Sequence, residues 1–398
     1  MPESTQDHTS EQAGFSRRAL IAGGIGAAGA AGLGVFGSSP AIAASAGSRS
    51  RRHRRKKRTH VVLLGTGGGP TYYNAGQRGE PSSAFVVGDR YYLIDAGAGV
   101  LRQTAKARLG SQVRPGRDPL DQLRAVFITH QHSDHIGGLA GLVSVGLFNG
   151  TIAADRPIKL IGPGNRGALH PLVGDAPPPP VVNPDNPTPG TRDMFRSLVA
   201  AYATDFNDRA RDNRRPVPDE LWEAIDIELP SNLTADPNGN PTPEMDPITI
   251  YSDDRVSVSA ILVAHGPAFP AFAFRFDTDD GSAVFSGDTS PNPNLITLAA
   301  DADVLVHEVI SRQAYEEIFP EPRTPAQEAL LQHILGSHTT IEDVGPIAEA
   351  AGVKTLALNH LAPSDLHPRL FARAGRNFSG KTIVGEDLMV VNIGGPTV

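Results

Sequence analysis

The sequence predicts an α/β protein of four layers, αββα, in which helices cover the outer faces of two packed sheets, with one insertion. Apolar segments of strand length alternate with helical segments in both halves of the 398-residue chain. The second half repeats the first in style, and no short-period repeat is present. The apolar fraction of 39% and the charged fraction of 20% are typical of a globular protein.

The N-terminal segment has the features of an export signal. Arg17 and Arg18 precede a weakly apolar stretch rich in Gly and Ala, and residues 41–43 and 44–46 offer two small-x-small cleavage sites. This pattern resembles a twin-arginine (Tat) signal peptide over residues 1–46. It predicts a protein exported to the periplasm or the exterior by the Tat machinery. An uncleaved membrane anchor is the alternative interpretation.

A basic linker, residues 47–59, follows the signal. Its stretch 49–58 is nearly all Lys and Arg, which indicates either a solvated tether or contact with an anionic surface. Residues 1–58 carry ten Lys and Arg against three Asp and Glu, whereas the rest carries 26 against 40. Because phosphate binding needs clustered cations, this acidic body predicts that nucleic acid is not a partner.

The elements of the first half are short apolar runs bounded by glycine or turn residues. They predict strands at 60–65, 84–87, 91–94, 125–129 and 158–161, and helices at 100–109 and 136–148.

Residues 171–246 are predicted to be an insertion in the domain that spans 60–398. Eight prolines between Pro171 and Gly190 exclude helix or sheet interior. Apolar side chains at three- and four-residue spacing then predict an amphipathic helix over 194–206, and a short apolar helix is expected at 221–225.

The second half continues with further strands and one capped helix. Strands are expected at 256–264, 271–276, 283–285, 303–307 and 355–358, and a helix at 340–351.

The strongest motif is His130-x-His132-x-Asp134-His135, which follows the predicted strand 125–129. In extended backbone, His130 and His132 point the same way and can share one metal. The turn into the next helix directs Asp134 and His135 towards a second metal. Three later residues also end apolar strands: His265, Asp288 and His360.

These seven residues, in this order and context, resemble the metallo-β-lactamase superfamily. The resemblance implies the αββα fold and a binuclear hydrolase centre, with Asp288 bridging the two metals. The implied ligands of one metal are His130, His132 and His265, and those of the other are Asp134, His135 and His360.

The donor types favour zinc, although manganese and iron also accept imidazole and carboxylate. The chain has no cysteine, which excludes thiolate ligands and disulfides. Two metals about 3.5–4 Å apart can hold a bridging hydroxide at neutral pH.

Four further segments are similar to the branch that contains tRNase Z and the bacterial arylsulfatase-like hydrolases. They are residues 64–70, 93–97, 306–308 and 337–340. The resemblance implies that Asp95 supports the metal loop and that Glu308 orients His338, which protonates the leaving oxygen. The expected catalytic residues are Asp134, Glu308 and His338.

The sequence allows two main interpretations of the substrate class. The family's tRNA enzymes carry a basic arm between the third histidine and the bridging aspartate, whereas only 22 residues separate His265 from Asp288. With the export signal and the acidic body, this spacing favours an exported, arylsulfatase-like zinc hydrolase of sulfate or phosphate (di)esters that acts on small molecules. The alternative is a tRNase Z-type 3′-processing endoribonuclease. A non-enzymatic metal-binding or cell-wall-binding protein is disfavoured by the complete ligand set.

Overall fold

The computed structural model describes residues 59–71, 77–110, 118–154, 156–172 and 177–394. The predicted signal peptide and nearly all of the basic linker lie outside these residues. Among the described residues, no helix combines the length and the apolar character that a membrane span requires.

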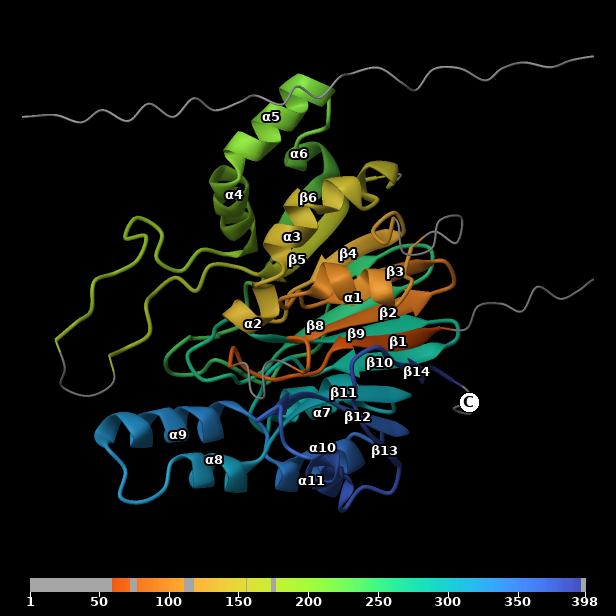
Figure 1. Cartoon of the computed structure of the whole chain (residues 1–398). Coiled ribbons are helices and arrows are strands. Elements are labelled where there is room, and N and C mark those ends of the chain that lie inside the picture. Colours follow the sequence, from red (N-terminus) through yellow and green to blue (C-terminus); the bar gives the residue numbers. More distant parts are fainter. Residues whose placement is uncertain (1–58, 72–76, 111–117, 155, 173–176, 395–398) are drawn as a thin grey trace, which may run out of the picture. The chain divides into compact units, whose positions relative to one another are not determined.

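Two seven-stranded sheets pack face to face (Figure 1). The strands of sheet A, in spatial order, are β14 (Met389–Asn392), β1 (His60–Gly65), β2 (Ser82–Val87), β3 (Arg90–Ile94), β4 (Leu123–Phe127), β5 (Ile158–Pro163) and β6 (Trp222–Ile227). Those of sheet B are β13 (Lys381–Val384), β12 (Thr355–Ala362), β11 (Val304–Ile310), β10 (Gly281–Phe285), β9 (Phe272–Thr278), β8 (Ser257–Leu262) and β7 (Ile248–Ser252).

The two sheets share one topology. In sheet A the strands from β14 to β3 pair antiparallel, and those from β3 to β6 pair parallel. In sheet B the strands from β7 to β10 pair antiparallel, and those from β10 to β13 pair parallel. This repetition confirms the predicted αββα class and places the carboxyl ends of both parallel runs where polar loops can meet.

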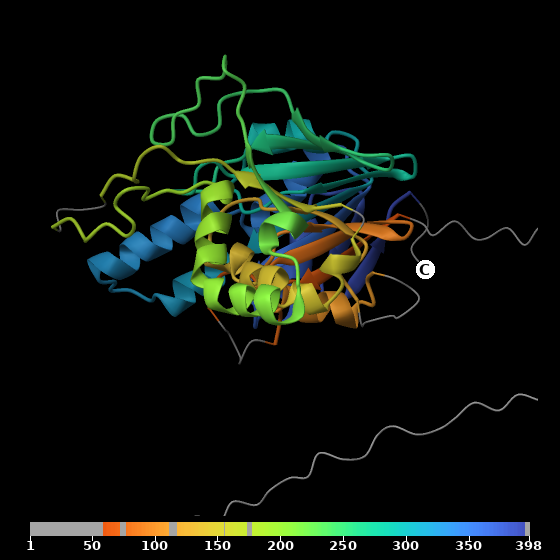
Figure 2. The same cartoon turned by 90° about the horizontal axis from the view of Figure 1, so that it is seen from above.

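Helices cover the outer face of each sheet. Sheet A carries α1 (Val100–Lys106), α3 (Leu139–Ser144), α4 (Thr191–Ala201) and α5 (Ala203–Asn213), which lie on one side in Figures 1 and 2. Sheet B carries α7 (Pro293–Ala299), α10 (Ile341–Ala350) and α11 (Pro368–Phe371). The remaining helices are α2 (Ser133–Ile136), α6 (Pro218–Leu221), α8 (Arg312–Ile318) and α9 (Pro325–Ser337), with short 3₁₀ turns at Gly146–Phe148, Thr151–Ala153 and Ala372–Gly375.

The inner strands β1 to β5 and β10 to β12 are largely apolar, as expected when both faces of a sheet are covered. In β1, Val61 and Leu63 belong to the core between the sheets, whereas Val62 and Leu64 belong to the core beneath the helices of sheet A. The same division repeats in β2, where Phe85 faces the other sheet and Ala84 faces the helices.

Three predicted helices differ in the structure. The helix predicted over 136–148 is replaced by the end of α2, by α3 and by the 3₁₀ turn Gly146–Phe148. The segment expected as a helix at 221–225 begins the edge strand β6, which pairs in parallel with β5, so the insertion predicted over 171–246 contains a strand of the sheet. The helix predicted over 194–206 is divided at Tyr202 into α4 and α5. Short apolar segments fit either period, and pairing with a neighbouring strand decides between them.

Candidate metal centre

All seven predicted metal-binding side chains meet at one edge of the sandwich. His130 and His132 follow β4, and Asp134 and His135 lie in α2, all from sheet A. His265 follows β8, Asp288 follows β10, and His360 lies within β12 of sheet B with a positive φ of 44°. The carboxyl ends of parallel strands share an edge, which is why residues 230 positions apart in the chain converge here.

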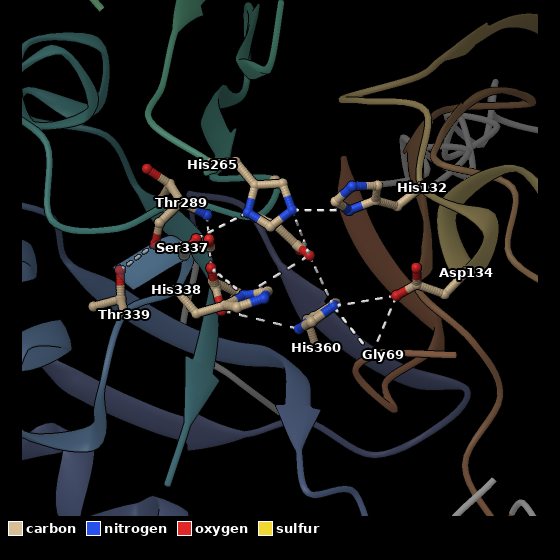
Figure 3. Close-up of polar contacts among 12 residues, drawn as sticks. Gly69, His132, Asp134, His265, Thr289, Ser337, His338, Thr339 and His360 are labelled. Atoms are coloured by element: carbon tan, nitrogen blue, oxygen red, sulfur yellow. Dashed lines mark hydrogen bonds and ion pairs between the residues drawn. The ribbon is translucent and has the colours of Figure 1, made fainter. Parts of the chain in front are cut away.

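Three imidazoles form the first group. The ligand atoms of His130, His132 and His265 lie within 4.8 Å of one another, and His265 Nε2 is 3.0 Å from His132 Nδ1 (Figure 3). Burial lowers the pKa of all three histidines, so the neutral, lone-pair-bearing imidazole is favoured. Neutral imidazole is the form that binds a metal.

The second group combines imidazole and carboxylate. Donor atoms of Asp134, His135, Asp288 and His360 also lie within 4.8 Å of one another. Asp134 Oδ2 is 3.4 Å from the Nε2 atoms of both His135 and His360. Burial disfavours the protonated imidazoles, but the carboxylates outweigh it and raise the pKa of His360 to about 10. The carboxylates therefore provide the negative charge that a bound cation needs.

Asp288 joins the two groups. Its Oδ2 atom lies 3.9 and 3.7 Å from Nε2 of His130 and His265, and 3.3 and 3.1 Å from Nε2 of His135 and His360. A single carboxylate oxygen thus stands between both groups, the position expected of a bridging ligand.

Several buried donor and acceptor atoms of these residues have no hydrogen-bond partner among the described residues. They are Nε2 of His130, Nε2 of His135, Oδ1 of Asp288 and Nδ1 of His360. Buried polar atoms are ordinarily satisfied. Nε2 of His130 and Nε2 of His135 lie 3.9 and 3.3 Å from Asp288 Oδ2, so these two unpartnered atoms fit coordination to cations. The donor set therefore fits metal ions.

Neighbouring polar groups orient the imidazoles. His135 Nδ1 lies 2.8 Å from Asp95 Oδ2, and His265 Nδ1 lies 2.8 Å from the carbonyl oxygen of Ser337. When each Nδ1–H donates to its acceptor, Nε2 is left as the free lone pair facing the centre. Asp95 also accepts the backbone N–H and the hydroxyl of Thr129, which ties it to the residue before the His motif.

The glycine loop after β1 closes one side of the centre. The Gly69 amide is 3.1 Å from Asp134 Oδ2 and 3.3 Å from His360 Nε2. A Cβ on Gly68 would lie only 2.5 Å from His360 Nδ1, so a side chain cannot be accommodated there without displacing the imidazole.

Glu308 and His338 form a buried pair beside the centre. Glu308 lies in β11, and His338 follows α9; His338 Nδ1 is 3.0 and 2.9 Å from the two Glu308 oxygens. Burial raises the pKa of Glu308 and opposes protonation of His338, but Glu308 outweighs burial and raises the pKa of His338. The Thr289 amide also donates to Glu308 Oε1 at 2.6 Å, which fixes the carboxylate.

Two pockets meet at His132. The first, with a volume of about 420 Å³, is bounded by the metal-binding residues on one side and by α8 and α9 on the other. The second, of about 270 Å³, lies between Gln131, Arg166 and the proline-containing segments 187–189 and 267–270. The centre is therefore open in two directions.

The sequence prediction missed the α8–α9 wall of the first pocket. A signal for α9 was present, because Thr324 and Gln327 form a capping box and Pro325 occupies the first helical turn. The apolar lining residues lie on separate elements, however, so no local pattern identifies them as a site. They include Ile310, Tyr315, Leu330 and Ile334.

Comparison with known proteins supports this assignment of the fold. The model of the family described as "Metallo-beta-lactamase superfamily" matches residues 77–331. A protein named Ribonuclease Z from Mycobacterium marinum is 28% identical over 340 residues, which cover 84% of this chain and 98% of that protein. A second Ribonuclease Z, from Mycolicibacterium paratuberculosis, is 29% identical over 343 residues, which cover 85% and 99%.

Solved structures show the same fold. The short form of human tRNase Z superposes with a TM-score of 0.53 at 19% identity, covering 84% of this chain and 99% of that chain. The metallo-beta-lactamase fold protein YhfI from Bacillus subtilis gives a TM-score of 0.51 at 18% identity, covering 84% and 99%.

These relatives correct two predictions made from the sequence. The expectation of an arylsulfatase-like hydrolase of small esters is wrong, because relatives aligned over nearly their whole length are named Ribonuclease Z. The exclusion of nucleic acid is wrong for the same reason. It relied on the net charge of the whole body and on the short spacing between His265 and Asp288, and neither quantity describes the surface around the centre.

Proposed function

This chain belongs to the metallo-beta-lactamase superfamily and is a metal-dependent hydrolase of ester bonds, and we propose that it is a ribonuclease Z-like enzyme that cleaves phosphodiester bonds in RNA. One observation carries the proposal. A seven-residue centre and a buried Glu308–His338 pair lie together in a chain that aligns with ribonucleases over 84% of its length.

We further propose that the centre holds two zinc ions, with His130, His132 and His265 at one and Asp134, His135 and His360 at the other. Asp288 would contact both. Zinc suits a set of neutral imidazoles and carboxylates without thiolate. When bound, two such cations supply Lewis-acid activation of the phosphate and of the attacking water at neutral pH.

The chain's own residues would manage the proton on the leaving oxygen. Glu308 accepts the Nδ1–H of His338 and favours the imidazolium, so Nε2 of His338 carries the proton that the leaving oxygen needs. Thr289 and Thr339 hold this arrangement in place. The Thr289 amide donates a hydrogen bond to Glu308, and the Thr289 carbonyl oxygen accepts one from the Thr339 hydroxyl at 2.6 Å (Figure 3).

The two pockets favour a diester as the substrate. A phosphodiester has a substituent on each side of the phosphorus, and pockets open on both sides of His132. A monoester would need only one of them.

The test is cleavage of an RNA hairpin that carries a 3′ single-stranded extension by purified, zinc-loaded protein. We expect metal-dependent cleavage by the wild type, none by the Asp288→Ala variant, and none after chelation. An aryl sulfate serves as the comparison substrate. Turnover of the aryl sulfate with no cleavage of RNA would reject the proposal.

A separate proposal concerns location. The paired arginines at 17–18, ahead of a weakly apolar stretch, support Tat-type export, although they lie outside the described residues. Replacing Arg17 and Arg18 together by Lys should leave the precursor in the cytoplasm, as followed by cell fractionation. Unchanged export of that variant, or a cytoplasmic wild-type protein, would reject this proposal.

A further inference from the structure

The apolar side chains of α8 and α9 have no part in metal binding or proton transfer, yet they make up much of the first pocket. The apolar lining residues on or next to these helices are Tyr315, Ile318, Phe319, Leu330 and Ile334, and strands β11 and β12 add Ile310 and Ala362. Ile318 and Leu330 are 45% and 47% exposed, which is unusual for large apolar side chains beside a polar centre. Exposed apolar surface in a cleft indicates a binding site for an apolar group.

The charge of the pocket limits what can occupy this wall. No Lys or Arg is among the described residues that line it; the polar lining groups are the metal-binding residues, Ser133, Thr71, His333 and His338. Along the described residues of this wall, a row of backbone phosphates would have no Lys or Arg to contact. A flat, uncharged ring would instead bury its faces against the apolar side chains.

The position of His338 identifies which part of the substrate enters. His338 lines this pocket and is absent from the lining of the second pocket. With the phosphate at the centre, the oxygen that His338 protonates must lie on the α9 side. The nucleotide that carries this leaving oxygen is therefore the one next to the apolar wall.

We propose that the α8–α9 pocket binds the unstacked base of the nucleotide on the leaving side of the scissile bond. This inference rests on the proposed ribonuclease function. The volume of about 420 Å³ lies within the range of small-molecule sites, about 300–1,000 Å³, and accommodates a base together with part of its ribose. The pocket then favours single-stranded RNA at the cleavage point, because a paired base would first have to be unpaired and unstacked, which costs free energy.

The experiment uses three versions of the hairpin RNA: unmodified, abasic at the nucleotide before the cleaved bond, and abasic at the nucleotide after it. Mass spectrometry of the product ends shows which oxygen left. For the wild type, we expect removal of the leaving-side base to lower kcat/KM by about 5- to 150-fold, and removal of the other base to have the smaller effect.

The test variant combines Ile318→Gln and Leu330→Gln, two exposed positions where the fold should tolerate a polar side chain. In the wild type, kcat/KM on unmodified RNA exceeds kcat/KM on the leaving-side abasic RNA. In this variant the ratio of these two values should fall towards one, while zinc content and Tm are retained. Val390→Gln is the matched control, since Val390 is 51% exposed on β14 and should keep the wild-type ratio.

Three results would overturn the inference. The first is a wild-type kcat/KM that is nearly the same on unmodified and leaving-side abasic RNA. The second is a larger loss of kcat/KM when the other base is removed. The third is a double variant that keeps the full wild-type difference between unmodified and leaving-side abasic RNA. Failure of the proposed function gives a different result, because zinc-loaded wild type would then cleave none of the three RNAs.

Discussion

Replacing His338 by Ala separates proton transfer from metal binding. Both oxygens of Glu308 lie 2.9–3.0 Å from His338 Nδ1, so Glu308 fixes the imidazole through Nδ1 and leaves the Nε2 proton for transfer. His338 Nδ1 lies 3.9 Å from Asp288 Oδ2, beyond the distance of a hydrogen bond. The variant should therefore retain both metals while it loses the proton donor.

The size of the effect depends on the leaving group. A ribose oxygen leaves as a poor alkoxide, so the whole contribution of a general acid is lost, about 10²- to 10⁴-fold, or about 2.7–5.5 kcal/mol of transition-state stabilisation. A nitrophenolate leaves without much help from a proton. The loss should therefore be large on RNA and at least tenfold smaller on bis(4-nitrophenyl) phosphate.

The assay compares kcat/KM on both diesters with zinc content by mass spectrometry. Glu308→Gln is the matched control, because it keeps a hydrogen-bonding side chain but removes the charge that raises the pKa of His338. Wild-type cleavage of RNA should decline as pH rises through the raised pKa of His338, and in Glu308→Gln this decline should begin at lower pH. Equal loss on both diesters with zinc retained would remove His338 from the acid role, and loss of zinc would make it part of the metal site.

Three other predictions follow from the geometry. Asp288→Ala should lose bound zinc, measured by mass spectrometry, because no carboxylate between the two cations would then offset their repulsion; a variant that keeps two zinc ions would contradict the bridging position. Gly68→Ala should displace the His360 imidazole, 2.5 Å from the new Cβ, and reduce zinc content without unfolding the protein; unchanged zinc affinity would show that the loop can move. Zinc binding at pH 7 should release about one to two protons, because carboxylates raise the pKa of metal-free His360 to about 10 and that of His135 well above its usual value. Calorimetry in buffers of different ionisation enthalpy measures the number of protons released. A binding enthalpy that does not depend on the buffer would contradict this prediction.

The sequence was sufficient for the fold class and for the composition of the centre. His130 to His135 lie within six residues after an apolar strand, so the period of extended backbone alone predicts which side chains share a side. The later residues could be recognised because each stands at or near the end of an apolar strand. The mistaken helix at 221–225 shows the limit of this approach, since β6 exists by pairing with β5 rather than by a distinctive local pattern.

The substrate class depended on information that a linear pattern does not hold. Net charge is a property of the whole chain, whereas RNA meets only the surface around the centre, so the acidic body misled the prediction. Relatives aligned over most of the chain corrected it.

Strand-end motifs and residue types are local, and the sequence alone determines them: seven donors suited to zinc, a carboxylate–imidazole pair, and an αββα fold to carry them. Their meeting is not local. Asp288 stands within 4 Å of imidazoles from both sheets because the sheets pack face to face with their parallel strands ending at one edge. The apolar pocket beside it likewise exists only where α8 and α9 fold against β11 and β12, because its lining residues come from separate elements that contact one another only in the packed chain.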